Sequence, residues 1–162
     1  MTLLADLVRT SARVAESPGR LAKIRELADY LKGLDESELE IAIPYLSGEI
    51  RQGKLSMPYA ALAAAREDVS APQGRLALAE VDTAFQHLKD TKGPGSADRR
   101  RTILRSLFEK ATVDEQDFLA RLMIGELRQG ALVGVMAEAV AAAVSAPPGA
   151  IRRAATFAGG IV

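Results

Sequence analysis

An eight-residue string occurs twice in this chain, and it constrains the fold more than any other feature of the sequence. The first copy, GEIRQGKL, spans residues 48–55, and the second, GELRQGAL, spans residues 125–132. A repeat at a long period is the signature of a fold built from two similar units. We therefore predict two related halves, at about residues 17–66 and 94–144, arranged as a pseudo-twofold repeat of helical hairpins.

Helix-start signals precede both strings at the same spacing of 77 residues. Asp35 lies three positions before Glu38, and Thr112 lies three positions before Glu115. Each pair fits a capping box, in which the first side chain accepts from the helix backbone and the glutamate reaches back to the cap. Further candidate caps, for the helix before each box, are Ser17 and Ser96.

Glycine and proline divide the chain into helical stretches. They gather at 17–19, 71–74, 93–95 and 147–149, whereas the stretches between them are rich in Ala, Leu, Glu and Arg. The expected fold is therefore all-α, a single compact multi-helix domain over residues 1–162.

Two more helices complete the expected domain. A helix at about 75–89 bridges the halves, and a last helix in PPGAIRRAATFA stops near Val162, so we expect the chain to be a fragment of a longer protein. Apolar residues recur at helical spacing before each string, and they are the expected core: Leu39, Ala42, Ile43, Leu46 and Ile50, then Phe118, Leu119, Leu122 and Leu127. Expected core fillers are Met57, Met123 and Met136.

The glycines of the repeated string suit the end of a helix. Gly53 and Gly130 are expected to end the preceding helices in the left-handed conformation, with the next helix starting almost at once. The free amides of that next helix would attract an anion such as phosphate, and Arg51 and Arg128 lie one turn back. Ordinary C-terminal capping in a duplicated scaffold also accounts for the glycines, although capping does not need the whole Gly-Glu-x-Arg-Gln-Gly pattern in both places, so both interpretations stay open.

A third candidate element is the segment KGPGSADRRR, residues 92–101. Its glycine-rich loop opens into a helix, and the cations are Lys92, Arg99, Arg100 and Arg101. No Gly-Lys-Ser/Thr follows, so a nucleoside triphosphate site of the Walker type is not indicated.

Composition excludes several kinds of site. There is no Cys and only one His, so disulfides, thiol catalysis and a zinc site are excluded, and His87 is expected on a helix surface. Asp114, Glu115 and Asp117 fit helix capping better than a catalytic pair. The N-terminus has neither a signal peptide nor a membrane span, so the expected location is the cytoplasm, with no membrane partner. The formal net charge is zero, and DRRRTILR (98–105) is the main cationic cluster.

Longer stretches resemble a known family. FLARLMIGELRQGALVGVMAEAVAAA (118–143), the preceding KGPGSADRRRTILRSLFEKATVDEQ (92–116) and YLSGEIRQGKLSMPYAAL (45–62) resemble the N-terminal DNA-binding domain of ATP-dependent DNA ligases, particularly the bacterial branch. The resemblance covers nearly the whole chain. It implies an all-helical pseudo-twofold domain that sits on the minor groove at a nick and holds duplex DNA through its phosphates.

The resemblance also implies which residues contact DNA. They are Gly48, Arg51, Gln52, Gly53 and Lys54 in the first string, Gly125, Arg128, Gln129 and Gly130 in the second, and Gly95, Ser96, Arg99 and Arg100 in the third element. Eukaryotic members usually carry a basic residue where this chain has Glu126, so one charge contact is missing there.

The resemblance further implies partners that lie outside this segment. None of the six lysines stands in the Lys-x-Asp-Gly context that takes AMP in these ligases, so this segment is expected to be non-catalytic and to hold no cofactor of its own. ATP and Mg²⁺ would bind in the catalytic domains of the parent ligase. The expected partners are nicked duplex DNA and the adenylation and OB-fold domains of the same polypeptide, with the protein associated with the nucleoid.

A second hypothesis belongs to another functional class. The Ala-rich helices after each string could instead dock a protein, as in helical-repeat interaction modules without DNA binding. Survival of a protein complex at high salt, without any shift of nicked duplex, would favour that hypothesis.

Overall fold

The computed structural model describes residues 1–55, 57–127 and 130–143, with the backbone alone over 130–134. This part of the chain forms helices and no strand, which confirms the all-α prediction. The helices are α1 (Leu4–Glu16), α2 (Arg20–Leu31), α3 (Glu36–Leu46), α4 (Tyr59–Arg66), α5 (Leu78–Asp90), α6 (Ser96–Glu109), α7 (Val113–Ile124) and α8 (Gly130–Ala142). Across the described residues, no helix has the length and apolarity needed to cross a bilayer.

Both predicted capping boxes are present. The Asp35 carboxylate accepts the N–H of Glu38 at 2.9 Å, and the Glu38 carboxylate accepts the N–H of Asp35 at 3.2 Å. Before α7, the Thr112 hydroxyl accepts the N–H of Glu115 at 3.2 Å, and Glu115 accepts the N–H of Thr112 at 2.8 Å. These reciprocal bonds satisfy amides that have no partner inside the helix, so they fix where α3 and α7 begin.

The two serine caps are wrong predictions. Ser17 is the C-cap of α1 and donates its hydroxyl to the carbonyl of Arg13 at 2.7 Å, whereas α2 begins after Gly19. Ser96 is already the first residue of α6, and its N-cap is Gly95 in the left-handed conformation. In both places a glycine with positive φ turns the chain into the helix, so no serine side chain is needed there.

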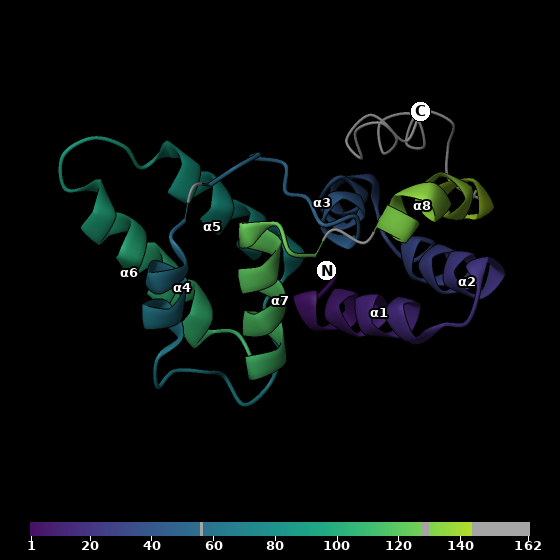
Figure 1. The fold of residues 1–162 in the computed structure, drawn as a ribbon, viewed down its shortest axis with the longest axis horizontal. Coiled ribbons are helices and arrows are strands. Elements are labelled where there is room, and N and C mark those ends of the chain that lie inside the picture. The colour runs from purple at the N-terminus through teal and green to yellow at the C-terminus, as the bar shows by residue number, and fades with distance from the viewer. Residues whose placement is uncertain (56, 128–129, 144–162) are drawn as a thin grey trace.

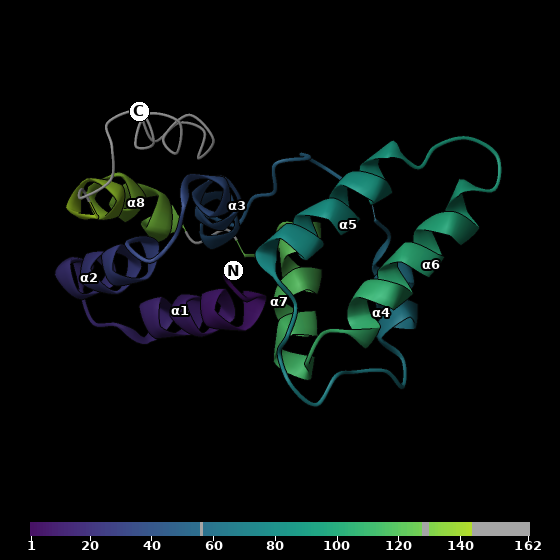
Figure 2. The same ribbon diagram turned by 180° about the vertical axis from the view of Figure 1, so that it is seen from behind.

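The helices gather in two lobes (Figure 1). One lobe contains α1, α2, α3 and α8, and the other contains α4, α5, α6 and α7, an arrangement that the opposite view also shows (Figure 2). Within the lobes, α2 packs against α8 and α6 packs against α4. Each half of the predicted repeat therefore contributes its last helix to the lobe of the other half.

Contacts between the lobes are reciprocal. Helix α3 packs on α5, and α7 packs on α1. The segments before α1 and α5 pair as an isolated antiparallel bridge between Leu3 and Ala77, with the N–H of Leu4 donating to Leu76 at 2.7 Å and that of Leu78 donating to Thr2 at 3.0 Å. This pattern favours a repeat in which α5 corresponds to α1, rather than serving only as a bridge between halves.

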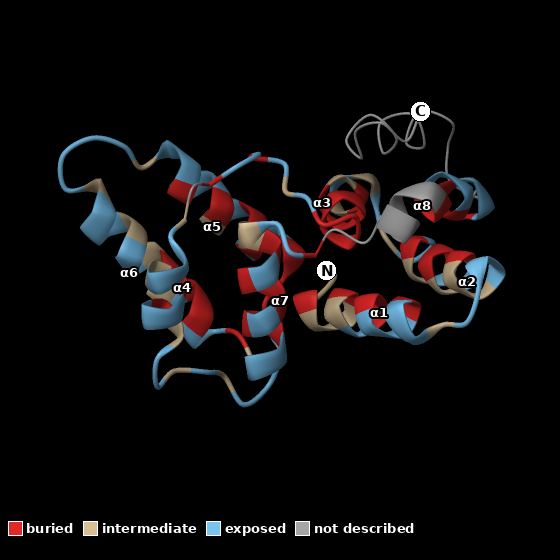
Figure 3. Ribbon diagram, in the orientation of Figure 1, coloured by how far each residue is buried: buried red, intermediate tan, exposed pale blue. Residues whose placement is uncertain are grey.

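The core lies along the inward faces of the helices in both lobes (Figure 3). Tyr45 of α3 and Phe85 of α5 are fully buried and meet edge to face across the lobes, with ring centroids 5.9 Å apart. The expected core residues that are buried are Leu39, Ala42, Ile43, Leu46, Phe118, Leu119, Leu122, Leu127 and Met136. Ile50, Met57 and Met123 are only partly buried against this core.

Candidate nucleic-acid interface

Each repeated string begins where a helix ends. Helix α3 ends at Leu46 and α7 at Ile124, and the glycines that follow, Gly48 and Gly125, have φ of 84° and 80°. A side chain with a Cβ would meet a steric cost in this left-handed conformation, and glycine does not. The first glycine of each string therefore adopts the left-handed conformation that makes the turn possible.

The same backbone bond closes both turns. In the first turn the N–H of Glu49 donates to the carbonyl of Pro44 at 2.8 Å. In the second, the N–H of Glu126 donates to the carbonyl of Arg121 at 2.9 Å. A bond of this span satisfies one of the last free carbonyls of a helix that ends on a left-handed glycine. The two strings thus share the structure of their first turn as well as their letters.

The prediction that the helices end at Gly53 and Gly130 is wrong. Gly53 has a positive φ of 74° but lies in a separate turn, and Gly130 is the first residue of α8. Helix α8 begins inside the second string, so the next helix starts almost at once, as predicted, whereas α4 begins only at Tyr59. Its N-cap is Pro58, and a proline keeps the preceding residue extended, so the chain before it cannot enter the helix earlier.

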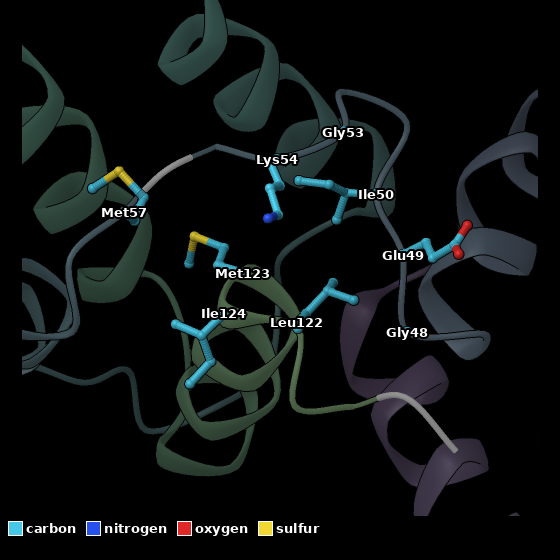
Figure 4. Close-up of a pocket in the computed structure, with 10 residues that line it drawn as sticks. Gly48, Glu49, Ile50, Gly53, Lys54, Met57, Leu122, Met123 and Ile124 are labelled. Atoms are coloured by element: carbon cyan, nitrogen blue, oxygen red, sulfur yellow. The ribbon is translucent and has the colours of Figure 1, made fainter. Parts of the chain in front are cut away.

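The two turns line one cavity of about 470 Å³ (Figure 4). Gly48 and Gly53 come from the first string, and Gly125 comes from the second. Five apolar side chains also line the described wall: Ile50, Met57, Leu122, Met123 and Ile124. Two segments that are far apart in the sequence, and that follow helices of different lobes, therefore face a common space.

Lys54 brings a positive charge into this space. Its side chain extends toward Met123 in Figure 4, and it is the one cation among the described residues of the cavity wall. The residue is exposed and forms no ion pair within the part of the chain that the structure describes. Glu49 also borders the cavity, but its carboxylate points away from Lys54. The ammonium group is therefore available to an anion.

Arg51 and Gln52 have partners inside the protein. The Arg51 guanidinium donates to both carboxylate oxygens of Asp82, at 3.0 Å and 2.6 Å, and lies 3.9 Å from Glu40. Hydrogen bonding to Asp82 raises the pKa of Arg51 and outweighs the opposing effect of its partial burial. Gln52 is 4% exposed and donates to Asp82 at 2.9 Å. Arg51 and Gln52 are thus both engaged by Asp82, and their predicted contacts with DNA stay predictions.

The arginines of the third element are also used internally. Arg99 donates to the carbonyls of Lys92 and Pro94, so it holds the loop that contains Gly95 and precedes Ser96. Arg100 donates to the carbonyl of Leu55, just after Lys54. This element does not line the cavity between the turns. Its place beside DNA stays a prediction.

Arg128 and Gln129 lie outside the described residues. Their predicted contacts with DNA are therefore neither supported nor opposed by the geometry of the second turn, which the structure describes through Leu127.

Sequence reasoning missed Asp82. It lies in α5 on a face that is otherwise buried and apolar, together with Leu78, Val81, Phe85 and Leu88. An acid at such a position needs a buried partner, because a charge leaves water at a high cost. That signal could have indicated an internal arginine, although it does not say which one.

The sequence family described as "DNA ligase N terminus" matches residues 51–141. The chain belongs to this family. The match includes all of the second string, the four helices α4 to α7 and nearly all of α8.

Individual relatives match almost the whole chain. A protein of Anaeromyxobacter sp. (strain Fw109-5) named "Probable DNA ligase" is 47% identical over 98% of this chain and 31% of its own length. A "Probable DNA ligase" of Saccharopolyspora erythraea is 45% identical over 95% of this chain and 30% of its own, and one of Mycolicibacterium gilvum is 44% identical over 97% and 30%. The chain thus spans about a third of the length of these curated relatives.

Proposed function

We propose that this chain binds nicked duplex DNA through the phosphates that border the minor groove, without sequence preference, as the DNA-binding domain of a DNA ligase. The observation that carries the proposal is the cavity shared by the two glycine turns, with Lys54 on its wall. Backbone that approaches a ligand closely needs residues without a side chain, and glycines supply such a surface at three places. Membership of the DNA ligase N-terminus family supports this assignment.

Phosphate contacts fit the chemistry of the turns. The second turn leads into the N-terminus of α8, where unpaired amides and the helix dipole attract an anion. Lys54 adds a mobile positive charge to the first turn. Contacts of this kind fix the position of a protein on a duplex but do not read its bases. Binding that tolerates any sequence is what sealing nicks at arbitrary positions would require.

The rest of a ligase would have to be supplied by other domains. ATP and Mg²⁺ would bind in an adenylation domain, and an OB-fold domain would help to enclose the duplex. We infer that these domains belong to the same polypeptide, because the relatives named as probable DNA ligases are about three times as long as the matched segment. Binding to duplex DNA would also associate the protein with the nucleoid.

Replacing Lys54 by alanine tests the proposal. We expect Lys54→Ala to weaken binding to nicked duplex and to reduce the slope of log K against log salt by about 0.9, the share of one phosphate contact. Fluorescence anisotropy between roughly 50 and 200 mM salt measures both quantities. Lys110→Ala is the matched control, because Lys110 lines a different cavity between α5 and α6.

Three outcomes would contradict the proposal. The wild-type chain could fail to bind duplex DNA, or its binding could be independent of salt. A strong preference for one base sequence at equal length and salt would also contradict it. Capture of a protein partner at high salt, together with no binding to duplex DNA, would favour the helical-repeat interaction module instead.

A further inference from the structure

We propose that Asp82 is a positioning residue for DNA binding, a carboxylate on α5 that holds the first glycine turn at a fixed distance from the second. This inference rests on the proposed function and adds a residue to it. Asp82 lies outside both repeated strings and does not line the cavity between them. Any effect on DNA would therefore have to pass through the residues that it binds.

Three donors from the first string converge on Asp82. The Nε and one Nη of Arg51 bind separate carboxylate oxygens, at 3.0 Å and 2.6 Å, in the paired geometry typical of arginine and carboxylate. The Nε2 of Gln52 donates to Oδ1 of Asp82 at 2.9 Å. The Asp82 side chain is 13% exposed, so water replaces few of these bonds if they break.

The clamp formed by Asp82, Arg51 and Gln52 acts directly on the cavity wall. Arg51 and Gln52 lie between Ile50 and Gly53, which both line the cavity, and Lys54 follows next. Holding the two clamped side chains therefore limits how far the whole string can move. The clamp thereby fixes the positions of the Gly53 backbone and of the start of the Lys54 side chain in the cavity wall.

The clamp also connects the two lobes. The first turn follows α3 of one lobe, whereas Asp82 belongs to α5 of the other lobe, which also contains α7 and the second turn. Phe85, one helical turn after Asp82, packs against Tyr45 of α3 and supports the same junction. Because the clamp joins the first turn to the lobe of the second, it sets the separation of the two turns, and thus the spacing of the phosphates that they can hold together.

A direct phosphate contact by Arg51 is the competing hypothesis. It would require a phosphate to displace a partner that binds two nitrogens of the guanidinium, and it would leave the largely buried Asp82 with two donors fewer. Displacing Arg51 is unfavourable, because the Asp82 carboxylate, whose side chain is 13% exposed, would lose its charged partner while it stays largely out of water. The geometry therefore favours a structural role for Arg51 over a contact with DNA.

The clamp belongs to one half of the repeat. The Leu3–Ala77 bridge aligns α1 with α5, and this register places Val8 where α5 has Asp82. The second string therefore has no carboxylate at the equivalent position. Only the first string is held by the clamp. This role would account for the presence of Arg and Gln in the first string even though its arginine is not free to bind phosphate.

Salt-dependent DNA binding by the 162-residue chain separates the two roles of Arg51. We expect Asp82→Asn and Arg51→Ala each to weaken binding to nicked duplex by roughly eightfold at 0.1 M salt. This is roughly the factor by which one phosphate contact, here that of Lys54, strengthens binding when the salt concentration falls from 1 M to 0.1 M. Each should also reduce the salt slope by about 0.9. In a Lys54→Ala background neither change should reduce the slope further, because the contact that depends on the clamp is already absent.

Several results of this experiment would contradict the positioning role of Asp82. If Arg51→Ala reduces the slope in both backgrounds, Arg51 itself contacts phosphate. Tighter binding by Asp82→Asn would make Asp82 a competitor of DNA, and unchanged binding would give it no role. Should Asp82→Asn fail to fold by circular dichroism, Asp82→Glu keeps the charge but displaces the turn, and it should show the same loss of slope. A wild-type chain that binds no duplex would instead overturn the proposed function itself.

Discussion

At the residue scale, the second turn of the interface requires a residue that tolerates a positive φ, and Gly125 is that residue. Its φ is 80°, and an added Cβ would meet nothing within 4 Å, so the cost of a side chain there is conformational rather than steric crowding. We expect Gly125→Ala to lower the free energy of unfolding by roughly 1 kcal/mol, the cost of a left-handed residue with a Cβ. A urea titration measures the change.

Gly33→Ala is the matched control for this prediction. Gly33 has no positive φ, and an added Cβ would have one ordinary contact, 3.7 Å from the carbonyl of Tyr30. Its replacement should be neutral or slightly stabilising, because alanine restricts the unfolded chain. Equal losses at both glycines would show that the left-handed turn is not what makes Gly125 necessary.

The residue scale also shows what the sequence could not reveal. A glycine turn in each string was predictable, because the same glycines recur at the same spacing in both copies, and Lys54 stands out as a cation directly after one of them. The ion pair between Arg51 and Asp82 was not predictable, since Asp82 lies 31 positions further along the chain, on helix α5. A local pattern identifies which residue can bind an anion, but not whether the protein already supplies one.

At the scale of single helices, the two capping boxes differ in their charge. Asp35 caps α3 with a carboxylate, whereas Thr112 caps α7 with a hydroxyl. Bonds from the N–H of Glu38 and from Ser37 hold the pKa of Asp35 below its usual value of 3.8. A lowered pKa stabilises the fold at pH values where the unfolded carboxylate is ionised, and this contribution is lost as the pH falls through the folded pKa.

Asp35→Asn tests this charge. Asparagine caps a helix about as well as aspartate, so stability at pH 7 should change by only a few tenths of a kcal/mol, whereas Asp35→Ala should cost about 1 kcal/mol. Between about pH 5 and pH 3 the wild type should lose more stability than the asparagine variant. Thermal melts across this range measure both effects, and parallel curves would contradict the assigned role of the carboxylate.

Helix starts were predictable only where side chains determine them. The capping boxes left a clear spacing in the sequence, and the structure confirms both. The starts of α2 and α6 depend on the backbone of Gly19 and Gly95, so the neighbouring serines were misleading. Where a serine and a glycine lie close together, either residue can begin a helix, and the sequence does not say which one adopts the turn.

At the scale of the whole molecule, the exchange of the last helices was not predictable from the repeat. Each half reads as a self-contained unit, yet α4 packs with α6 and α8 packs with α2. Which apolar faces meet depends on contacts between residues far apart in the chain, and periodicity does not encode them. The exchange makes the halves interdependent, and both glycine turns line one cavity.

Amide hydrogen exchange with and without nicked duplex tests the central claim most directly. The claim is that both glycine turns close on the same DNA. Saturating duplex should slow exchange in Gly48–Lys54 and in Leu122–Leu127 together. At a DNA concentration near the Kd of the wild type, Lys54→Ala should reduce both effects. Slower exchange in only one of the two turns, or only at sites away from the shared cavity, would contradict the account.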